Sequence, residues 1–155
     1  MKIIIARHGQ KIMVSDKDFS WLSKHTWGIS NSGYAIRYTQ KTRTIFMHRE
    51  VLQKMSGKLS KNVYTDHINR DKLDNRRENL RKATRGQNQS NSIARVNKNG
   101  FRGITQHRNG NRWTASILFN RRRIYLGLYK NQKEAAIAYD SKAKEIFGEF
   151  AVLNF

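Results

Sequence analysis

The C-terminal third of the chain contains the segment NQKEAAIAYDSKAKEIFG, which runs from Asn131 to Gly148. Its apolar residues recur at helical spacing and form one stripe along a helix. Asn131 is a favourable N-cap with Glu134 three residues later, and Gly148 stands where many helices end. The segment therefore predicts a helix whose apolar face must be covered by another element.

The residues before this helix supply a sheet that can cover it. Three segments alternate in strand fashion, namely Phe101–His107, Arg112–Phe119 and Arg122–Tyr129. Turns rich in Asn and Gly separate them, which is typical of hairpins. We predict a three-stranded antiparallel sheet packed on one helix, as a domain spanning residues 96–155.

The N-terminal part predicts short strands and one short helix. The strand-like segments are Met1–Ala6, Lys11–Val14, Tyr34–Thr39 and Thr44–Met47. Residues 15–24 favour a short helix, and residues 92–99 have the composition of a linker. The predicted fold class is α+β in two domains, 1–95 and 96–155, with supporting strands in residues 1–60.

Composition restricts the partners of the chain. The 155 residues carry a formal net charge of +20 and contain no cysteine. Such a charge favours a polyanion through phosphate contacts and counterion release, and nucleic acid is the leading class over a membrane surface. The absence of cysteine excludes disulfides and Cys-ligated zinc. No segment suits a membrane span or a signal peptide, so we expect a cytoplasmic protein.

Residues 62–92 are polar and have few apolar anchors, so they must form turns or a site. Val63–Asp66 is typical of a strand end and Leu80–Ala83 of a short returning strand. Thr84 and Gln87 can form a capping box, which predicts a helix starting near Arg85. This order of elements would bring Asp66 close to Asn88.

The side chains of this segment suit metal-assisted phosphodiester hydrolysis. A carboxylate from Asp66 and an amide oxygen from Asn88 are ligands for a hard cation such as Mg²⁺. His67 has an ordinary pKa of about 6.5 and can accept a proton from water. Asn79 can hold the connecting loop through hydrogen bonds to the backbone. On residue types alone, a turn or a surface hydrogen bond is the commoner explanation of an Asp-His pair.

The run YTDHINRDKLDNRRENLR, residues 64–81, resembles the core of HNH endonucleases of the phage and intron-homing kind. The upstream Met47-His48-Arg49 and the downstream Gln87-Asn88 fit that resemblance. It implies a ββα-metal unit over about 61–93, with Asp66 and Asn88 as metal ligands, His67 as general base and Asn79 fixing the loop.

The run departs from many HNH enzymes at its third motif position. Asn88 stands there in place of His, and Ser92 stands where some relatives have a further His ligand. The departure favours Mg²⁺ or Mn²⁺ over zinc. For His48, an approach to the scissile phosphate and a structural role both remain open.

The C-terminal unit resembles the AP2 DNA-binding domain. The matching residues are Phe101-Arg102-Gly103-Ile104, Arg112-Trp113, Ala115-Ser116-Ile117, Tyr125-Leu126-Gly127, Glu134–Asp140, Gly148 and Leu153-Asn154-Phe155. The resemblance implies a sheet that enters the major groove of duplex DNA. The DNA contacts that it implies are Arg102, Thr105, His107, Arg123 and Tyr125, with Arg108, Arg121 and Arg122 as phosphate partners. Thr105 and Leu118 replace arginines of the plant members, so the base preference stays open.

Three functions follow from these patterns. The leading one is a monomeric, Mg²⁺- or Mn²⁺-dependent HNH homing endonuclease without a small-molecule cofactor, which nicks or cleaves double-stranded DNA in the cytoplasm of a bacterial host if it is encoded by a phage. The second is a non-catalytic AP2-type DNA-binding regulator with a degenerate HNH unit. The third is a structural RNA binder of ribosomal type, which would prefer A-form RNA to duplex DNA.

Overall fold

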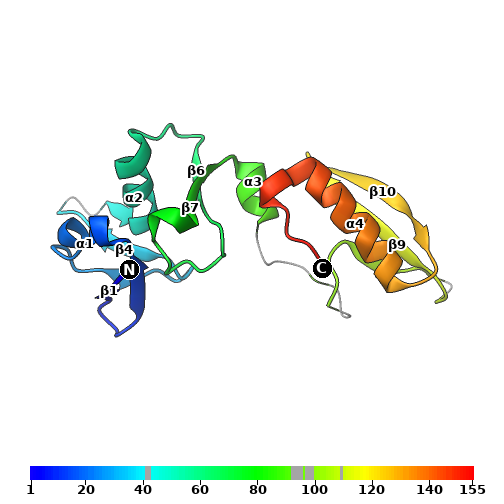
Figure 1. The fold of residues 1–155 in the computed structure, drawn as a ribbon, viewed down its shortest axis with the longest axis horizontal. Helices are drawn as coiled ribbons and strands as arrows, with labels where there is room; N and C mark the ends of the chain where they lie inside the picture. Colours follow the sequence, from blue (N-terminus) through cyan, green and yellow to red (C-terminus); the bar gives the residue numbers. More distant parts are fainter. Residues whose placement is uncertain (41–42, 92–95, 97–99, 109) are drawn as a thin grey trace. The chain divides into compact units, whose positions relative to one another are not determined.

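The computed structural model describes residues 1–40, 43–91, 96, 100–108 and 110–155. These residues form two compact units, Met1–Arg85 and Gly86–Phe155 (Figure 1). The mixture of helices and strands confirms the predicted α+β class. The predicted linker over 92–99 lies largely outside the described residues, and the domain boundary at 95/96 stays a prediction.

The first unit contains three small antiparallel sheets. In β1–β2, β3–β4–β5 and β6–β7, neighbouring strands pair antiparallel. The strands are β1 (Lys2–Ile5), β2 (Lys11–Val14), β3 (Gly28–Ile29), β4 (Ala35–Tyr38), β5 (Thr44–Phe46), β6 (Tyr64–His67) and β7 (Leu80–Ala83). The helices are α1 (Asp16–Leu22), α2 (Met47–Ser56) and the short 3₁₀ helix η1 (Arg77–Asn79).

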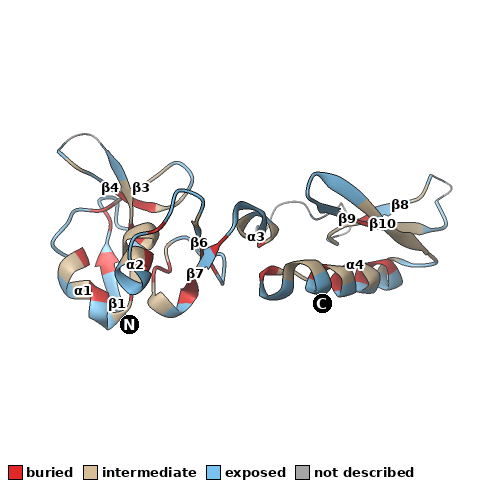
Figure 2. Cartoon of the chain, turned by 90° about the horizontal axis from the view of Figure 1, so that it is seen from above, coloured by how far each residue is buried: buried red, intermediate tan, exposed pale blue. Residues whose placement is uncertain are grey.

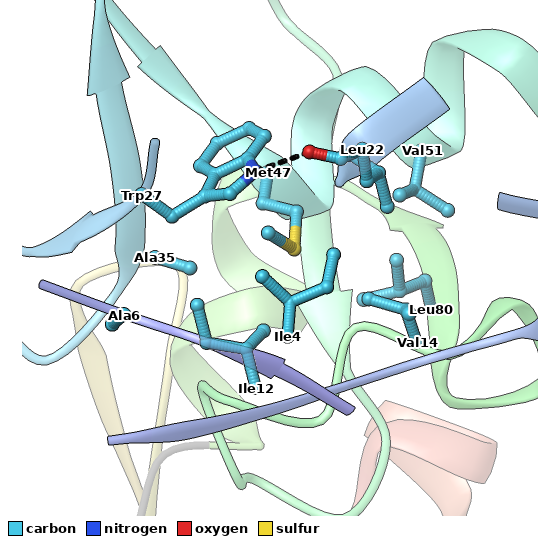
Figure 3. Close-up of a cluster of buried hydrophobic side chains, with 10 residues drawn as sticks. All are labelled: Ile4, Ala6, Ile12, Val14, Leu22, Trp27, Ala35, Met47, Val51 and Leu80. Carbon is cyan, nitrogen blue, oxygen red and sulfur yellow. Dashed lines mark hydrogen bonds between the residues drawn. The ribbon is translucent and has the colours of Figure 1, made fainter. Parts of the chain in front are cut away.

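One hydrophobic core joins these sheets and helices (Figure 3). Trp27 is its largest fully buried side chain, and its Nε1 donates a hydrogen bond of 2.9 Å to the backbone oxygen of Leu22. The bond satisfies the one polar atom of the indole, so the ring can be buried at little cost. The other buried members come from both ends of the unit: Ile4, Ala6, Ile12, Val14, Leu22, Ala35, Met47, Val51 and Leu80.

Helix α2 was not predicted: besides the short helix over residues 15–24, only strands were expected in residues 1–60, and that expectation is wrong at α2. The predicted strand Thr44–Met47 ends one residue earlier, and Met47 begins the helix. Met47, Val51 and Leu52 are buried and lie on one helical face. Gly57, with φ of 77°, follows as the C-cap. The helical spacing and the glycine were present in the sequence, but the adjacent β-rich run obscured them.

The β6–β7 connection is attached to β2 by its backbone. The amide of Met13 donates to the oxygen of Leu73, and the amide of Asn75 donates to the oxygen of Met13, at 2.9 and 2.8 Å. These two bonds form a parallel bridge at Asp74. The β1–β2 hairpin therefore holds the connection between β6 and β7 in place through the backbone of Met13.

An ion pair fixes the same segment to α1. The fully buried carboxylate of Asp18 accepts two hydrogen bonds of 2.7 Å from Arg77, through Nε and Nη2. Trp21 Nε1 donates a third bond of 3.1 Å to it. Burial raises the pKa of Asp18, but the bonds from Arg77 and Trp21 outweigh this effect, so the pKa lies below its ordinary value.

The second unit is a three-stranded antiparallel sheet with one long helix along one face (Figure 2). Its elements are α3 (Arg85–Ser90, which starts at the last residue of the first unit), β8 (Ile104–Gln106), β9 (Trp113–Phe119), β10 (Arg122–Tyr129), α4 (Gln132–Phe147) and the 3₁₀ helix η2 (Gly148–Phe150). The predicted order of three strands and one helix is confirmed, with β8 shorter than expected.

Local chemistry sets the ends and the packing of α4. Asn131 Oδ1 accepts a hydrogen bond of 2.9 Å from the amide of Glu134, as the capping pattern predicted. Gly148 has φ of 53° directly after the helix. At Gly103, also with positive φ, an added Cβ would collide with the ring of Tyr139 on α4. A glycine is therefore required just before β8, where the backbone packs against the Tyr139 ring of α4.

Within the part of the chain that the structure describes, no helix has the length and apolar character needed to cross a membrane.

The Asp18–Arg77 pair should make stability depend on pH. A carboxyl whose folded-state pKa is lowered contributes stability above its unfolded pKa of about 3.9 and loses it as pH falls through the folded pKa. Asp18→Asn should therefore lower the free energy of unfolding by about 2 kcal/mol at neutral pH, and the difference from wild type should shrink below about pH 4. Urea unfolding followed by tryptophan fluorescence measures both effects.

The matched control is Asp16→Asn in the same turn of α1. Asp16 is exposed and pairs with the exposed N-terminal amine. Its substitution should change stability by less than about 0.5 kcal/mol. A difference between Asp18→Asn and wild type that stays constant down to about pH 3 would contradict the assignment of the ion pair.

Candidate active site and DNA-binding surface

Asp66 lies on β6 directly opposite Arg81 on β7. Its Oδ2 accepts a hydrogen bond of 2.8 Å from Arg81 Nε, and both side chains are largely buried. Directly opposed residues on one face of an antiparallel pair have adjacent Cβ atoms, so the strand register itself brings the two groups together. A carboxylate offers about four lone-pair positions, so this ion pair is compatible with a metal bond to the same group.

His67 ends β6 and packs among other rings of the first unit. Its ring centroid lies 5.9 Å from that of Tyr34 and 5.1 Å from that of His48. Burial lowers the pKa of His67, and the nearby side chains of Asn75 and Asp66 only partly oppose that shift. The imidazole is therefore neutral at neutral pH, which is the form that can accept a proton.

His48, in the first turn of α2, contacts the same rings. Its centroid lies 4.9 Å from that of Tyr34 and 5.5 Å from that of Phe46. Burial, followed by the proximity of His67, lowers the pKa of His48 to about 3. A neutral side chain in contact with three rings supports a structural role for His48 beside His67.

Asn79 joins the two ends of the connection that follows His67. Its Oδ1 accepts a bond of 2.9 Å from the amide of Asn69, and its Nδ2 donates a bond of 2.8 Å to the backbone oxygen of Asp74. Its own backbone oxygen accepts from the amide of Ile68 at 2.9 Å. The side-chain to backbone bonds expected of Asn79 are thus present, although its part in catalysis stays a prediction.

Asp74 is the buried centre of this connection. Arg76 donates two bonds of 2.7 Å to its carboxylate, and Asn69 Nδ2 donates another of 2.8 Å. Burial raises the pKa of Asp74, but the bonds from Arg76 outweigh it, and the pKa lies below its ordinary value. The loop is therefore organised around a charged group that must stay ionised.

The predicted meeting of Asp66 and Asn88 around one metal ion stays a prediction. Asn88 lies on α3 in the second unit, and Asp66, His67 and Asn79 lie in the first. Among the described residues no group of three or more His, Cys, Asp or Glu could hold a metal ion. A donor set of one carboxylate and one amide oxygen contains too few of these residue types to form such a group, and its chemistry fits a hard cation.

The predicted DNA contacts lie mostly on the second unit's sheet and its turns. Arg123 and Tyr125 are exposed on one face of β10, and Thr105 is exposed on β8. Arg121, with φ of 64°, forms the two-residue turn between β9 and β10 together with Asn120. The remaining positions are the exposed Arg108 and Arg122 and the half-buried His107.

Arg102 differs from the other predicted contacts. Its Nη1 donates a bond of 3.4 Å to the backbone oxygen of Ser90, and its amide donates to Asn154 Oδ1 at 2.7 Å. Its side chain also interacts with Tyr139 of α4. These contacts give Arg102 a structural role within the unit, and its contact with DNA stays a prediction.

Comparison with known proteins places the β6–β7 segment in a family. A model of the HNH endonuclease family matches residues 46–90, which include Asp66, His67, Asn79 and Asn88. A protein of Acanthamoeba polyphaga mimivirus, named as an uncharacterized HNH endonuclease, is 34% identical over 135 residues, covering 86% of this chain and 68% of that protein. The chain belongs to the HNH endonuclease family. The resemblance that the sequence suggested is confirmed.

A second comparison concerns a segment of 57 residues. It is 47% identical to an AP2-like ethylene-responsive transcription factor of Arabidopsis thaliana and 47% identical to APETALA2-like protein 2 of Oryza sativa subsp. indica. The match covers 36% of this HNH family member but only 16% and 13% of the two plant proteins. The chain thus combines an HNH endonuclease unit with an AP2-like domain.

Sequence reasoning missed the side chains that support Asp66 and His67. Arg81 lies within the motif, but the motif resemblance implies no role for it. The pairing of the two predicted strands could have placed it opposite Asp66. Asn75, which is fully buried and adjacent to His67, was also missed. Nothing local in the sequence distinguishes Asn75 from the other asparagines of the loop.

The hydrogen bonds of Asn79 predict a local loss of order when its side chain is removed. Asn79→Ala should lower the free energy of unfolding by about 2 kcal/mol, because the buried backbone oxygen of Asp74 and the partly buried amide of Asn69 both lose their bonds. The amide of Asn69 should exchange its hydrogen much faster, as measured by nuclear magnetic resonance. The amide of Ile68 is the internal control, since its acceptor is the backbone of Asn79 and survives the substitution. If hydrogen exchange became equally faster at the amides of Asn69 and Ile68, the specific hydrogen bond from Asn69 to the Asn79 side chain would be refuted.

Proposed function

We propose that this HNH family member hydrolyses phosphodiester bonds of double-stranded DNA with a divalent cation, Mg²⁺ or Mn²⁺, and with His67 as general base. The observation that carries the proposal is the position of the His67 imidazole directly after Asp66 on β6, inside the segment that matches the HNH endonuclease family. HNH endonucleases generally depend on a divalent metal. We assign the DNA contacts to the AP2-like sheet.

The side chains divide the chemistry between them. His67 takes a proton from the attacking water, whose oxygen then bonds to phosphorus while the bond to the 3′ oxygen breaks. Asp66 and Asn88 would hold the cation, which when bound stabilises negative charge on the phosphate and on the departing oxygen. Asn79 keeps the loop after His67 in place, and Arg81 orients the Asp66 carboxylate.

Three roles in this proposal follow from contacts within the first unit. Burial lowers the pKa of His67, so its imidazole is in the neutral form that can accept a proton at neutral pH. The ion pair with Arg81 holds one Asp66 oxygen, which restricts rotation of the carboxylate. The ring contacts of Tyr34 and His48 restrict the orientation of the imidazole.

Nicking of supercoiled plasmid is the direct test. Wild-type protein with Mg²⁺ should nick or linearise the plasmid, and chelation should stop it. His67→Ala should reduce cutting by about 100- to 10,000-fold, the contribution typical of a general base, without weakening binding to duplex DNA. Asp66→Ala should also lose activity at every practicable Mg²⁺ concentration. His8→Ala is the matched control, because His8 is exposed and lies in the β1–β2 turn.

The outcomes separate the functions that the sequence left open. Equal cutting by wild type and His67→Ala would remove His67 from the mechanism. Tight binding without cutting at any Mg²⁺ or Mn²⁺ concentration would leave a non-catalytic DNA-binding protein. Stronger binding to A-form RNA than to duplex DNA would favour the RNA-binding alternative.

The phosphate contacts assigned to the sheet predict a salt effect. Arg122 is exposed at the start of β10, so Arg122→Ala should weaken binding similarly for all duplex sequences. The slope of log binding constant against log salt concentration should fall in magnitude by about 0.9 for the lost phosphate contact. Lys17→Ala, an exposed cation on α1, is the matched control and should leave the slope unchanged. An unchanged slope for Arg122→Ala would place the DNA elsewhere.

A further inference from the structure

The AP2-like sheet has an outer face that α4 leaves uncovered. Along β9, Ala115 and Ile117 are buried towards α4, so the intervening Thr114, Ser116 and Leu118 point to the other side. Register places their partners on β10 and β8 on the same outer face: Leu128, Tyr125 and Arg123 on β10, and Thr105 on β8.

Leu118 is unusual on this face. It is 58% exposed, although it is aliphatic and stands directly opposite the exposed Arg123. Tyr125, 64% exposed, is the next outward residue along β10. An aliphatic side chain next to an arginine cannot form a hydrogen bond with a base or a phosphate. Its contribution to binding has to come from contact with another apolar group.

The neighbouring arginine is held in a defined direction. Arg123 Nη1 donates a hydrogen bond of 3.1 Å to Ser116 Oγ, two residues before Leu118 on β9. The guanidinium therefore extends across the outer face alongside Leu118. Arg121 and Arg122 lie at the same end of the hairpin, so positive charge surrounds the aliphatic group. Charge complementarity identifies the occupant of this surface as a polyanion.

We propose that Leu118 reads the 5-methyl group of a thymine in the major groove, next to a base contacted by Arg123. The proposal rests on the proposed function, because it requires this sheet to bind duplex DNA. The thymine methyl is the apolar group that the base edges present in the major groove, and guanine O6 and N7 are the commonest acceptors for arginine. Side chains directly opposite on a sheet are about 5 Å apart and stacked bases about 3.4 Å apart, so two such long side chains can reach neighbouring bases.

Removing only the methyl group tests the contact. The full chain, in chelator to prevent cutting, is first used to enrich a random-sequence duplex library. The enriched duplex is then synthesised with deoxyuridine in place of thymidine, one position at a time. At the thymidine that contacts Leu118, replacement by deoxyuridine should weaken binding by about fourfold, which is the effect of losing one buried methyl group.

Variants of Leu118 assign the effect to this side chain. Leu118→Ala should bind the thymidine and deoxyuridine duplexes equally at that position and keep any differences elsewhere. Leu118→Met, which retains a flexible apolar side chain, should preserve the discrimination. Ile137→Ala is the matched control, because Ile137 is 53% exposed but lies on α4, which covers the opposite face of the sheet.

Each remaining outcome overturns the proposal. It fails if no sequence is enriched, if no position distinguishes thymidine from deoxyuridine, or if Leu118→Ala keeps the discrimination. A change of oligomeric state in Leu118→Ala would assign the patch to a contact between protein chains. Plasmid nicking by wild type in the same preparation would show that the nuclease proposal survives any of these results.

Discussion

The side chain of Asn79 joins two parts of the loop between β6 and β7. It bonds to the backbone on both sides of the loop between β6 and β7, through the amide of Asn69 and the oxygen of Asp74. The segment has few apolar side chains, so hydrophobic burial cannot hold it in one conformation. Hydrogen bonds of the buried Asn79 side chain and of the buried Asp74 carboxylate hold the segment instead. They fix the end of the strand that carries Asp66 and His67.

The same principle explains why so basic a chain folds. Of its 11 acidic residues, the most buried ones accept bonds from arginine or from backbone amides inside the protein. Asp18 and Asp74 each bind one arginine through two hydrogen bonds, and Asp140 accepts three bonds from Asn154 and one from the amide of Phe155. These buried acids thus stabilise the interior through hydrogen bonds, and the surface keeps the excess of positive charge that favours a polyanion.

Local pattern was sufficient for much of the fold, and contacts distant in sequence were not. The α4 helix and its sheet were predictable because the capping residues, the periodicity and the turn residues of this one continuous segment all indicate the same fold. Helix α2 was missed because Met47 directly continues a β-rich run, and its buried face becomes apparent only against Leu80 and Val14. For the site, motif resemblance identified Asp66 and His67, but the Arg81 and Asn75 contacts depend on strand register and loop path, which no single stretch encodes.

The alternation of residues along β9 separates two tasks within a single strand. Ala115 and Ile117 lie on the face that packs against α4, and the exposed Leu118 lies on the other face. Substitutions on the outer face can therefore change what the sheet binds without disturbing its packing on α4. Under the proposed function, the DNA preference of the domain would change in small steps that leave the HNH unit and its stability intact.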